Sequence, residues 1–221
     1  MKIVATSDTH FPFSQDLIEE GDVFIHAGDL MYSGLPDEWY PRVDSLKALE
    51  GYRTKLLVPG NHDYHLQNYA GLASSELRKA GVFVLTDYRP TVELDGVKYL
   101  GIPFVTGLPG WAFNREEEWV LDWLRNVTKD FKPDVVISHA PVYGILDAVY
   151  PDKEKWRDQL HVGGQAMNRW FYAQDIAPKL WVHGHIHESY GTEKVEDTMF
   201  MNVAMCDRNY EQVNPALTAE I

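Results

Sequence analysis

The stretch Asp22-Val23-Phe24-Ile25-His26-Ala27-Gly28-Asp29 joins a continuous apolar run to a glycine and a carboxylate. An unbroken run of this kind predicts a short strand that is buried on both faces of a sheet. Gly28 lets the backbone turn tightly where that strand ends, and Asp29 follows in the turn. The sequence therefore places a charged group at the carboxyl end of a buried strand.

Four further polar clusters lie along the chain, and three of them also come where an apolar run ends. They are Asp8-Thr9-His10, Gly60-Asn61-His62-Asp63, Ser138-His139-Ala140 and Gly184-His185-Ile186-His187. Predicted strands lie before them, over 2–5, 55–58, 134–138 and 180–183. In an open α/β sheet, ligands bind at the edge formed by the carboxyl ends of the strands. We therefore expect the five clusters to converge on one site.

Helical periodicity predicts three helices, over 38–49, 114–129 and 164–173. Asn114 is the expected cap of the second helix, whose first turn carries a solvated run of three glutamates at 116–118. Trp119, Trp123 and Leu124 are expected on its buried face. Alternation of such helices with apolar strands is typical of the α/β class.

Two hairpins and a last strand complete the expected fold. Asp95-Gly96 is a strong two-residue hairpin signal. A second hairpin turn is expected near Glu196-Asp197, and residues 216–221 are expected to form the final strand.

The bulk composition is that of a globular protein of 221 residues, which suits one domain over 1–221. The formal charge is -13, and a surface this acidic repels long nucleic acid, so we expect no partner of that kind. The single cysteine, Cys206, excludes an internal disulfide and fits a reducing compartment. We find no signal peptide and no membrane span, so the expected location is cytoplasmic. Nothing specifies an oligomer.

The residue types in the five clusters are those that bind divalent metals. Asp8 and His10 are two residues apart, so their side chains share a face of an extended backbone. The same spacing separates His185 from His187. Oxygen and nitrogen donors without a thiolate suit Mn, Fe, Zn or Ni. This inventory predicts a hydrolytic site for two metal ions.

The order of the clusters resembles that of the calcineurin-like metallophosphoesterase superfamily, which is D-x-H, G-D, G-N-H-D, a strand-terminal H and G-H-x-H. Within it, the chain is similar to the small metallophosphoesterase-domain-containing (MPPED-like) branch. That likeness rests on stretches such as Trp111-Ala112-Phe113-Asn114, Gly144-Ile145-Leu146-Asp147 and His161-Val162-Gly163. Asp63 departs from the branch, which often has Glu there, and agrees with the wider superfamily. The resemblance implies a four-layer fold in which helices flank two stacked mixed β-sheets.

Carried over position by position, the resemblance implies a role for each cluster residue. Asp8, His10 and His187 would hold one metal, and Asn61, His139 and His185 a second, with Asp29 as the bridge. His62 would protonate the leaving group or stabilise its charge. Asp63 would orient His62 through a hydrogen bond. The implied reaction is direct attack of a metal-bound hydroxide on phosphorus, with two divalent ions, Mn²⁺ first among them, as cofactors.

Histidines and a thiol outside the ligand set have plainer interpretations. His26 and His183 lie inside apolar runs, so structural roles are expected for both. We expect His65 at the surface and Cys206 as an inert buried thiol.

Four residues are candidate substrate contacts: His161, Asp147, Trp111 and Arg208. In the resembling branch, the loop of His161 lies near the substrate, and an ordinary loop role is the alternative. Trp111 follows Pro109-Gly110 and would line a pocket, although tryptophans more often serve the core. Arg208 is a candidate cation near the clusters.

The expected function is hydrolysis of small phosphate esters, with three alternatives kept open. Phosphodiesters, cyclic nucleotides among them, are favoured over monoesters, because a monoester dianion usually needs cationic clamps and few arginines fall near the clusters. A phosphatase acting on phosphoproteins or small molecules is the first alternative. A metal-binding scaffold without turnover is the second, and a nuclease acting on long DNA is the third.

Overall fold

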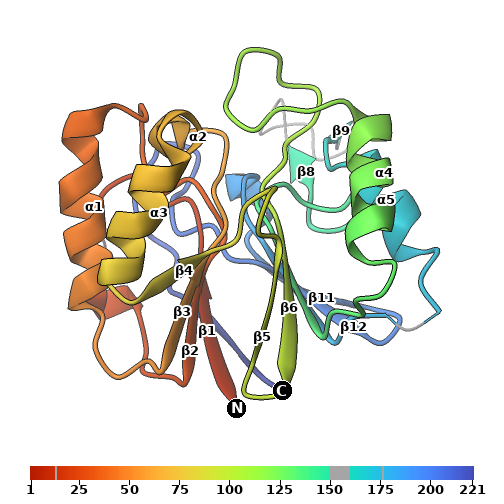
Figure 1. The fold of residues 1–221 in the computed structure, drawn as a ribbon, viewed down its shortest axis with the longest axis horizontal. Coiled ribbons are helices and arrows are strands. Elements are labelled where there is room, and N and C mark those ends of the chain that lie inside the picture. Colours follow the sequence, from red (N-terminus) through yellow and green to blue (C-terminus); the bar gives the residue numbers. More distant parts are fainter. Residues whose placement is uncertain (13, 150–159, 176) are drawn as a thin grey trace, which may run out of the picture.

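The computed structural model describes residues 1–12, 14–149, 160–175 and 177–221. Two large mixed sheets stand face to face at its centre (Figure 1). Helices α1 (Pro36–Ala48) and α3 (Ala70–Lys79) lie outside one sheet, and α4 (Glu117–Val127) and α5 (Gln165–Phe171) outside the other. This confirms the predicted α/β fold of two stacked sheets flanked by helices.

The first sheet contains five strands in the order β13-β1-β2-β3-β4. Their bounds are Leu217–Glu220, Lys2–Thr6, Val23–His26, Thr54–Leu57 and Val82–Val84. All neighbours are parallel except β13, which pairs antiparallel with β1. Parallel neighbours bring the carboxyl ends of β1, β2 and β3 to one edge, where three of the polar clusters begin.

The second sheet contains six strands in the order β11-β12-β10-β7-β6-β5. Their bounds are Gly191–Val195, Thr198–Asn202, Leu180–His183, Val135–Ser138, Val97–Ile102 and Thr91–Leu94. Both edge strands pair antiparallel with their neighbours, as the two predicted hairpins require. The parallel strands β7 and β10 end at the two remaining clusters.

Short elements complete the described chain. They are α2 (Tyr64–Asn68), the strand pair β8 (Ala148–Val149) and β9 (Leu160–His161), and the single 3-10 turns η1 (Gln15–Leu17) and η2 (His187–Ser189).

Alternate residues of the buried strands supply different cores. Val4 of β1 and Phe24 of β2 point outward, into the core beneath α1 and α3. Ile3 and Ile25 point inward and pack between the two sheets, where Tyr99 of β6 meets them. A third core lies between the second sheet and helices α4 and α5. The continuous apolar runs are thus explained by burial on both faces.

Helix α4 differs from its prediction at its start and on its surface. Asn114 is not the cap, because its Oδ1 accepts a bond from the Leu108 backbone and the helix begins at Glu117. Glu117 is not a solvated residue either, since it accepts bonds from Thr106 and from the first turn of α5. Trp119 is 45% exposed rather than buried, and packs edge-on against Phe104.

His65 is buried, in contrast to its predicted surface position. Its ring stacks on Trp39 with centroids 4.7 Å apart, and Tyr69 packs on it at 5.0 Å. The sequence pattern gave no sign of this, because the stacking partner comes from α1. Among the described helices, none combines the length and the apolar character needed to cross a bilayer.

Candidate metal centre

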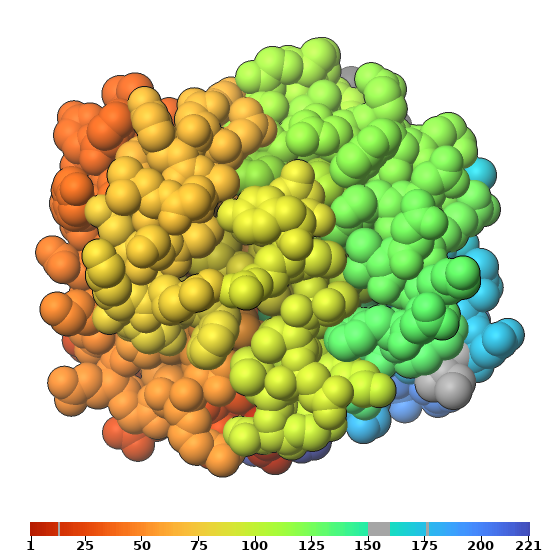
Figure 2. Space-filling model, viewed as in Figure 1, coloured from red at the N-terminus to blue at the C-terminus, as the bar shows by residue number. Residues whose placement is uncertain are grey.

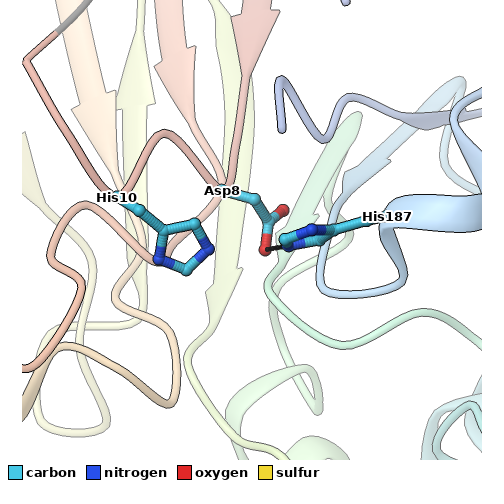
Figure 3. Close-up of side chains that lie close together, drawn as sticks. All are labelled: Asp8, His10 and His187. Atoms are coloured by element: carbon cyan, nitrogen blue, oxygen red, sulfur yellow. Dashed lines mark ion pairs between the residues drawn. The ribbon is translucent and has the colours of Figure 1, made fainter. Parts of the chain in front are cut away.

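The five clusters meet at the carboxyl ends of β1, β2, β3, β7 and β10. Asp8, His10 and His187 have ligand atoms within 4.8 Å of one another (Figure 3). The same holds for Asp29, His139 and His185. Asp29 also groups with His10 and His62, so it adjoins both sets. The structure thereby brings together every predicted ligand with a carboxylate or imidazole.

Asn61 joins the second set through its amide oxygen. Its Oδ1 lies 3.0 Å from His139 Nε2, and the Oδ2 of Asp29 lies 3.3 Å from the same nitrogen. All seven predicted ligands are therefore neighbours, although they come from residues 8 to 187.

The histidine rings are oriented by backbone carbonyls. His10 Nδ1 lies 3.0 Å from Met31 O, His139 Nδ1 2.9 Å from Ala27 O, and His187 Nδ1 2.8 Å from Asp207 O. A carbonyl only accepts, so each Nδ1 must carry the proton. When the ring is neutral, the lone pair is therefore on Nε2, which faces the cluster in all three rings. This arrangement of carbonyl, imidazole and open nitrogen is the one that fixes metal-binding histidines.

The two aspartates are fixed by donors from the neighbouring clusters. Oδ2 of Asp8 accepts bonds from the hydroxyl of Ser7 and the backbone N–H of His185. Oδ1 of Asp29 accepts from the backbone N–H of His62 at 2.8 Å. Each carboxylate thus keeps its other oxygen, Asp8 Oδ1 or Asp29 Oδ2, toward the imidazoles.

Burial and neighbouring charges shift the pKa values of the cluster residues in opposite directions. Burial by itself raises the pKa of a carboxyl group, yet His187 and His139 hold the pKa of Asp8 well below its usual range. Burial likewise lowers the pKa of an imidazole, but Asp29 and Asp8 outweigh it and raise the pKa of His139 to about 9. The two ionised aspartates are therefore stabilised by positive charge within the cluster.

A pair of divalent cations fits these residues. Within the part of the chain that the structure describes, His10 Nε2 and Asp8 Oδ1 are buried without a hydrogen-bond partner. Buried polar atoms are rarely left in this state, because each one loses its bonds to water. Both atoms face the cluster, and a cation between them would supply the missing interaction. Carboxylate, amide and imidazole donors suit Mn, Fe, Zn or Ni.

Four of the predicted ligands have left-handed backbone conformations. The φ angles are 52° at Asp8, 53° at His10, 54° at Asp29 and 71° at His185. Such a conformation costs a non-glycine residue about 1–2 kcal/mol, and it persists only where the surroundings enforce it. The fold thus holds these side chains in place against a local backbone preference.

Gly28 combines a left-handed backbone with close contact to a predicted ligand, and Gly28→Ala is expected to disrupt the centre. Its φ is 101°, and an added Cβ would lie 2.5 Å from His139 Nδ1 and 2.9 Å from Gly60 N. We expect the free energy of unfolding to fall by roughly 2–4 kcal/mol, from backbone strain plus overpacking. Chemical denaturation measures this change.

Gly51→Ala is the matched control. Gly51 also has a left-handed φ, of 88°, but an added Cβ would meet nothing within 4 Å. It should lose only about 1 kcal/mol, from the backbone strain alone. Equal losses in the two variants would show that contact with His139 is not the cause.

The structure does not support the predicted role of Asp63. Its Oδ1 accepts from the Met31 backbone and its Oδ2 from the Gly60 backbone, so both oxygens are taken. His62 is instead oriented by Tyr32, whose carbonyl oxygen contacts His62 Nδ1. Burial, with the nearby charge of Asp29, raises the pKa of Asp63 to about 7. Asp63 therefore joins the loop of Met31 to the loop of Gly60, and it is not the hydrogen-bond partner of His62.

The four candidate substrate contacts lie in different surroundings. Trp111 is 40% exposed, and its ring centroid is 4.7 Å from that of His62. Asp147 is fully buried; it bonds His161 Nδ1 at 2.5 Å and accepts from two glycine amides, which makes it an anchor of its loop. Arg208 is exposed, next to the residue whose carbonyl holds His187. Of the four, only Trp111 has a recorded ring contact with a cluster residue.

His26 and His183 are both fully buried, in keeping with structural roles. His26 Nε2 lies 3.0 Å from Thr9 Oγ1. Cys206 is buried as predicted, and burial raises the pKa of its thiol to about 12. At neutral pH such a thiol is protonated and unreactive.

A separate groove lies away from the clusters, on the face seen in Figure 2. Its volume is about 740 Å³, and its lining comes from α3, β4, the segment that follows β4, and the start of β5. It is lined by none of the predicted site residues.

Two stacked mixed sheets, with carboxylates and imidazoles gathered at the ends of their parallel strands, suit a metal-dependent hydrolase. A model of the calcineurin-like phosphoesterase family matches residues 1–189. The chain belongs to that family.

Curated relatives agree with this assignment. Metallophosphoesterase domain-containing protein 1 of Homo sapiens is 28% identical, over 100% of this chain and 71% of its own length. A UPF0046 protein of Caenorhabditis elegans is 29% identical, over 97% of this chain and 73% of its own length. The predicted likeness to the metallophosphoesterase-domain-containing branch is thereby confirmed.

A solved structure shares the fold. Phosphopantetheinyl hydrolase from Mycobacterium tuberculosis superposes with a TM-score of 0.61, over 95% of this chain and 90% of that one. The sequence identity is 16%, so the likeness concerns the arrangement of the chain alone.

Proposed function

We propose that this protein hydrolyses small phosphodiesters with the help of two divalent metal ions. One observation carries the proposal: Asp29 adjoins two sets of ligand atoms, each held within 4.8 Å. A shared carboxylate between two such sets is the arrangement that a two-metal hydrolytic site needs. Mn²⁺ is the expected ion, and Fe, Zn or Ni would suit the same donors.

The metal ligands and His62 have different roles in the proposed hydrolysis. When bound, the metal pair would lower the pKa of a water molecule and polarise the phosphoryl oxygens. Two divalent ions exceed the charge of Asp8 and Asp29, so the site attracts an anion despite the acidic surface. His62 lies beside the cluster with its Nε2 3.8 Å from Asp29 Oδ2, where it can give a proton to the departing alkoxide.

The charge of the surroundings favours diesters over monoesters. The side chains recorded around His62 are carboxylate, imidazole and aromatic groups. Arg42 is buried nearby, but its guanidinium is engaged by the carbonyl oxygen of His10 at 2.7 Å. Among the residues that the structure describes, no lysine or arginine contacts His62, so a monoester dianion would find less of the positive charge it usually requires there, whereas a diester carries one charge fewer. Cyclic nucleotides are small diesters of this kind.

The proposal is tested with bis-p-nitrophenyl phosphate and p-nitrophenyl phosphate in parallel assays, each with Mn²⁺ and with EDTA. We expect metal-dependent hydrolysis, faster for the diester. A preference for the monoester would make the protein a phosphatase instead. Absence of turnover with metal bound would contradict hydrolysis and leave the scaffold as the account to pursue.

A further inference from the structure

Aromatic rings surround the candidate metal centre on its solvent side. The Tyr210 ring lies 4.8 Å from His10, 5.3 Å from His187 and 5.3 Å from Tyr32, between centroids. Phe11 stacks on Tyr32 at 5.5 Å. With Trp111 over His62, these four rings (Phe11, Tyr32, Trp111 and Tyr210) form what we call the aromatic rim.

Three of the four rings of the aromatic rim are exposed to a degree that a packing role does not explain, while Tyr210 is half-buried. Phe11 is 41% exposed, Tyr32 44% and Trp111 40%, while the neighbouring ligands Asp8 and His10 are fully buried. Large apolar rings that stay open to solvent beside buried polar groups are the pattern of a ligand site.

Tyr210 is held in place against its backbone preference. Its φ is 63°, an unusual value for a bulky residue. The turn is fixed by the bond from Tyr210 N to Asp207 O and by the Asp207 carboxylate, which accepts from the backbone of Asn209 and Glu211. These bonds hold the strained turn, and with it the ring beside His10 and His187. Backbone strain of this kind concentrates at ligand-binding positions.

Tyr210 also lies outside the part of the chain that the family model describes, which ends at residue 189. The ring is thus contributed by a segment beyond the shared motifs. A residue of this kind is suited to select among substrates rather than to perform the reaction common to the family.

We propose that Tyr32 and Tyr210 form a stacking site for a planar aromatic group carried by the phosphate ester. The proposal rests on the proposed function and names the class of ester: one phosphate with an aryl ring or a nucleobase attached. Stacking requires a flat π-face and no charge, which matches a rim of rings. The phosphate would lie at the ligand cluster and the planar group against Tyr210.

Equilibrium binding tests the site without turnover. Phenylphosphonate and methylphosphonate share a head group and resist hydrolysis, so their dissociation constants can be compared by calorimetry on the Mn²⁺-loaded protein. We expect phenylphosphonate to bind about tenfold more tightly, the usual strength of aromatic stacking. Tyr210→Leu and Tyr32→Leu should each reduce this ratio severalfold, and Tyr210→Phe should preserve it.

Tyr40→Leu is the matched control, because Tyr40 is 63% exposed on α1. It should leave the phenyl-to-methyl ratio unchanged. If the rim only shields the ligands, Tyr210→Leu would lower Mn²⁺ affinity or thermal stability but not the ratio. A ratio near one in the wild-type protein, or one that persists in both leucine variants, would overturn the stacking site.

Kinetics then separate the two sources of a planar group. The p-nitrophenyl diesters of methanol, phenol and thymidine 5′-hydroxyl share a leaving group and differ in the group retained. We expect kcat/KM to be higher for one or both aromatic diesters than for the methyl diester, by about tenfold. A higher kcat/KM for the thymidine diester alone would indicate that the site binds a nucleobase. An equal increase for the thymidine and phenyl diesters would indicate that it accepts any aryl ring. Hydrolysis without aromatic preference contradicts the stacking site; failure to hydrolyse all three contradicts the proposed function instead.

Discussion

Asp29→Ala is expected to release both metal ions and to lower phosphodiester hydrolysis to the level seen in EDTA. Asp29 is the predicted bridging ligand: it groups with His139 and His185, and also with His10 and His62. Its Oδ2 lies 3.3 Å from His139 Nε2. Its Oδ1 also fixes the loop of His62 through the backbone N–H at 2.8 Å. Loss of the carboxylate would therefore remove a member of the second set and a neighbour of His10 in the first, and would free the loop that carries His62.

Elemental analysis of the dialysed variant measures this effect together with the rate. Asp122→Ala is the matched control, since Asp122 is exposed on α4 and pairs only with Arg125 among the described contacts. It should keep the wild-type metal content and rate. Two ions still bound to Asp29→Ala would refute its role as the bridging ligand.

His62→Ala is expected to keep both metals and to slow turnover by ~10²–10⁴, the usual contribution of a general acid. The side chain is 12% exposed, next to the buried cluster, and its Nδ1 is taken by the Tyr32 carbonyl. Its Nε2 is therefore the atom left to serve the leaving group. Metal analysis and steady-state kinetics on the same preparation check both parts of this expectation.

The slowing should depend on the leaving group. A good leaving group such as p-nitrophenolate needs little protonation, so His62→Ala should harm bis-p-nitrophenyl phosphate less than diphenyl phosphate. Because His62 also lies within reach of His10 and Asp29, loss of a metal ion from His62→Ala would make it a ligand instead. An unchanged rate of diphenyl phosphate hydrolysis in His62→Ala would show that His62 takes no part in the reaction.

The buried strands and the convergence of the polar clusters could be predicted because both depend on local sequence, whereas the stacked sheets and the individual ligand assignments came from the resemblance to the metallophosphoesterase superfamily. Continuous apolar runs such as residues 22–27 indicate buried strands, and parallel strands carry whatever follows them to one edge. His139 and Asp29 are far apart in sequence, yet each comes directly after such a strand. The pattern of strand ends was therefore sufficient to predict that the five clusters meet at one place.

The features that sequence reasoning missed depend on contacts between distant segments. His65 is buried because Trp39 of α1 covers it. The Asp63 carboxylate accepts hydrogen bonds from the backbones of Met31 and Gly60 rather than from His62. Tyr210 belongs to a turn whose strained φ appears only in the folded chain. The Asn114 cap was wrong because Asn114 bonds to Leu108, so that the helix starts three residues later. Local sequence patterns do not predict contacts between residues that are distant in the chain.

A titration of the metal-free protein with Mn²⁺ tests the central claim most directly, with bound ions and bis-p-nitrophenyl phosphate hydrolysis followed on the same samples. The two ligand sets joined by Asp29 predict that binding saturates at two ions per chain and that the rate rises with occupancy of the pair. Saturation at one ion, or full activity in the presence of EDTA, would contradict a two-metal centre.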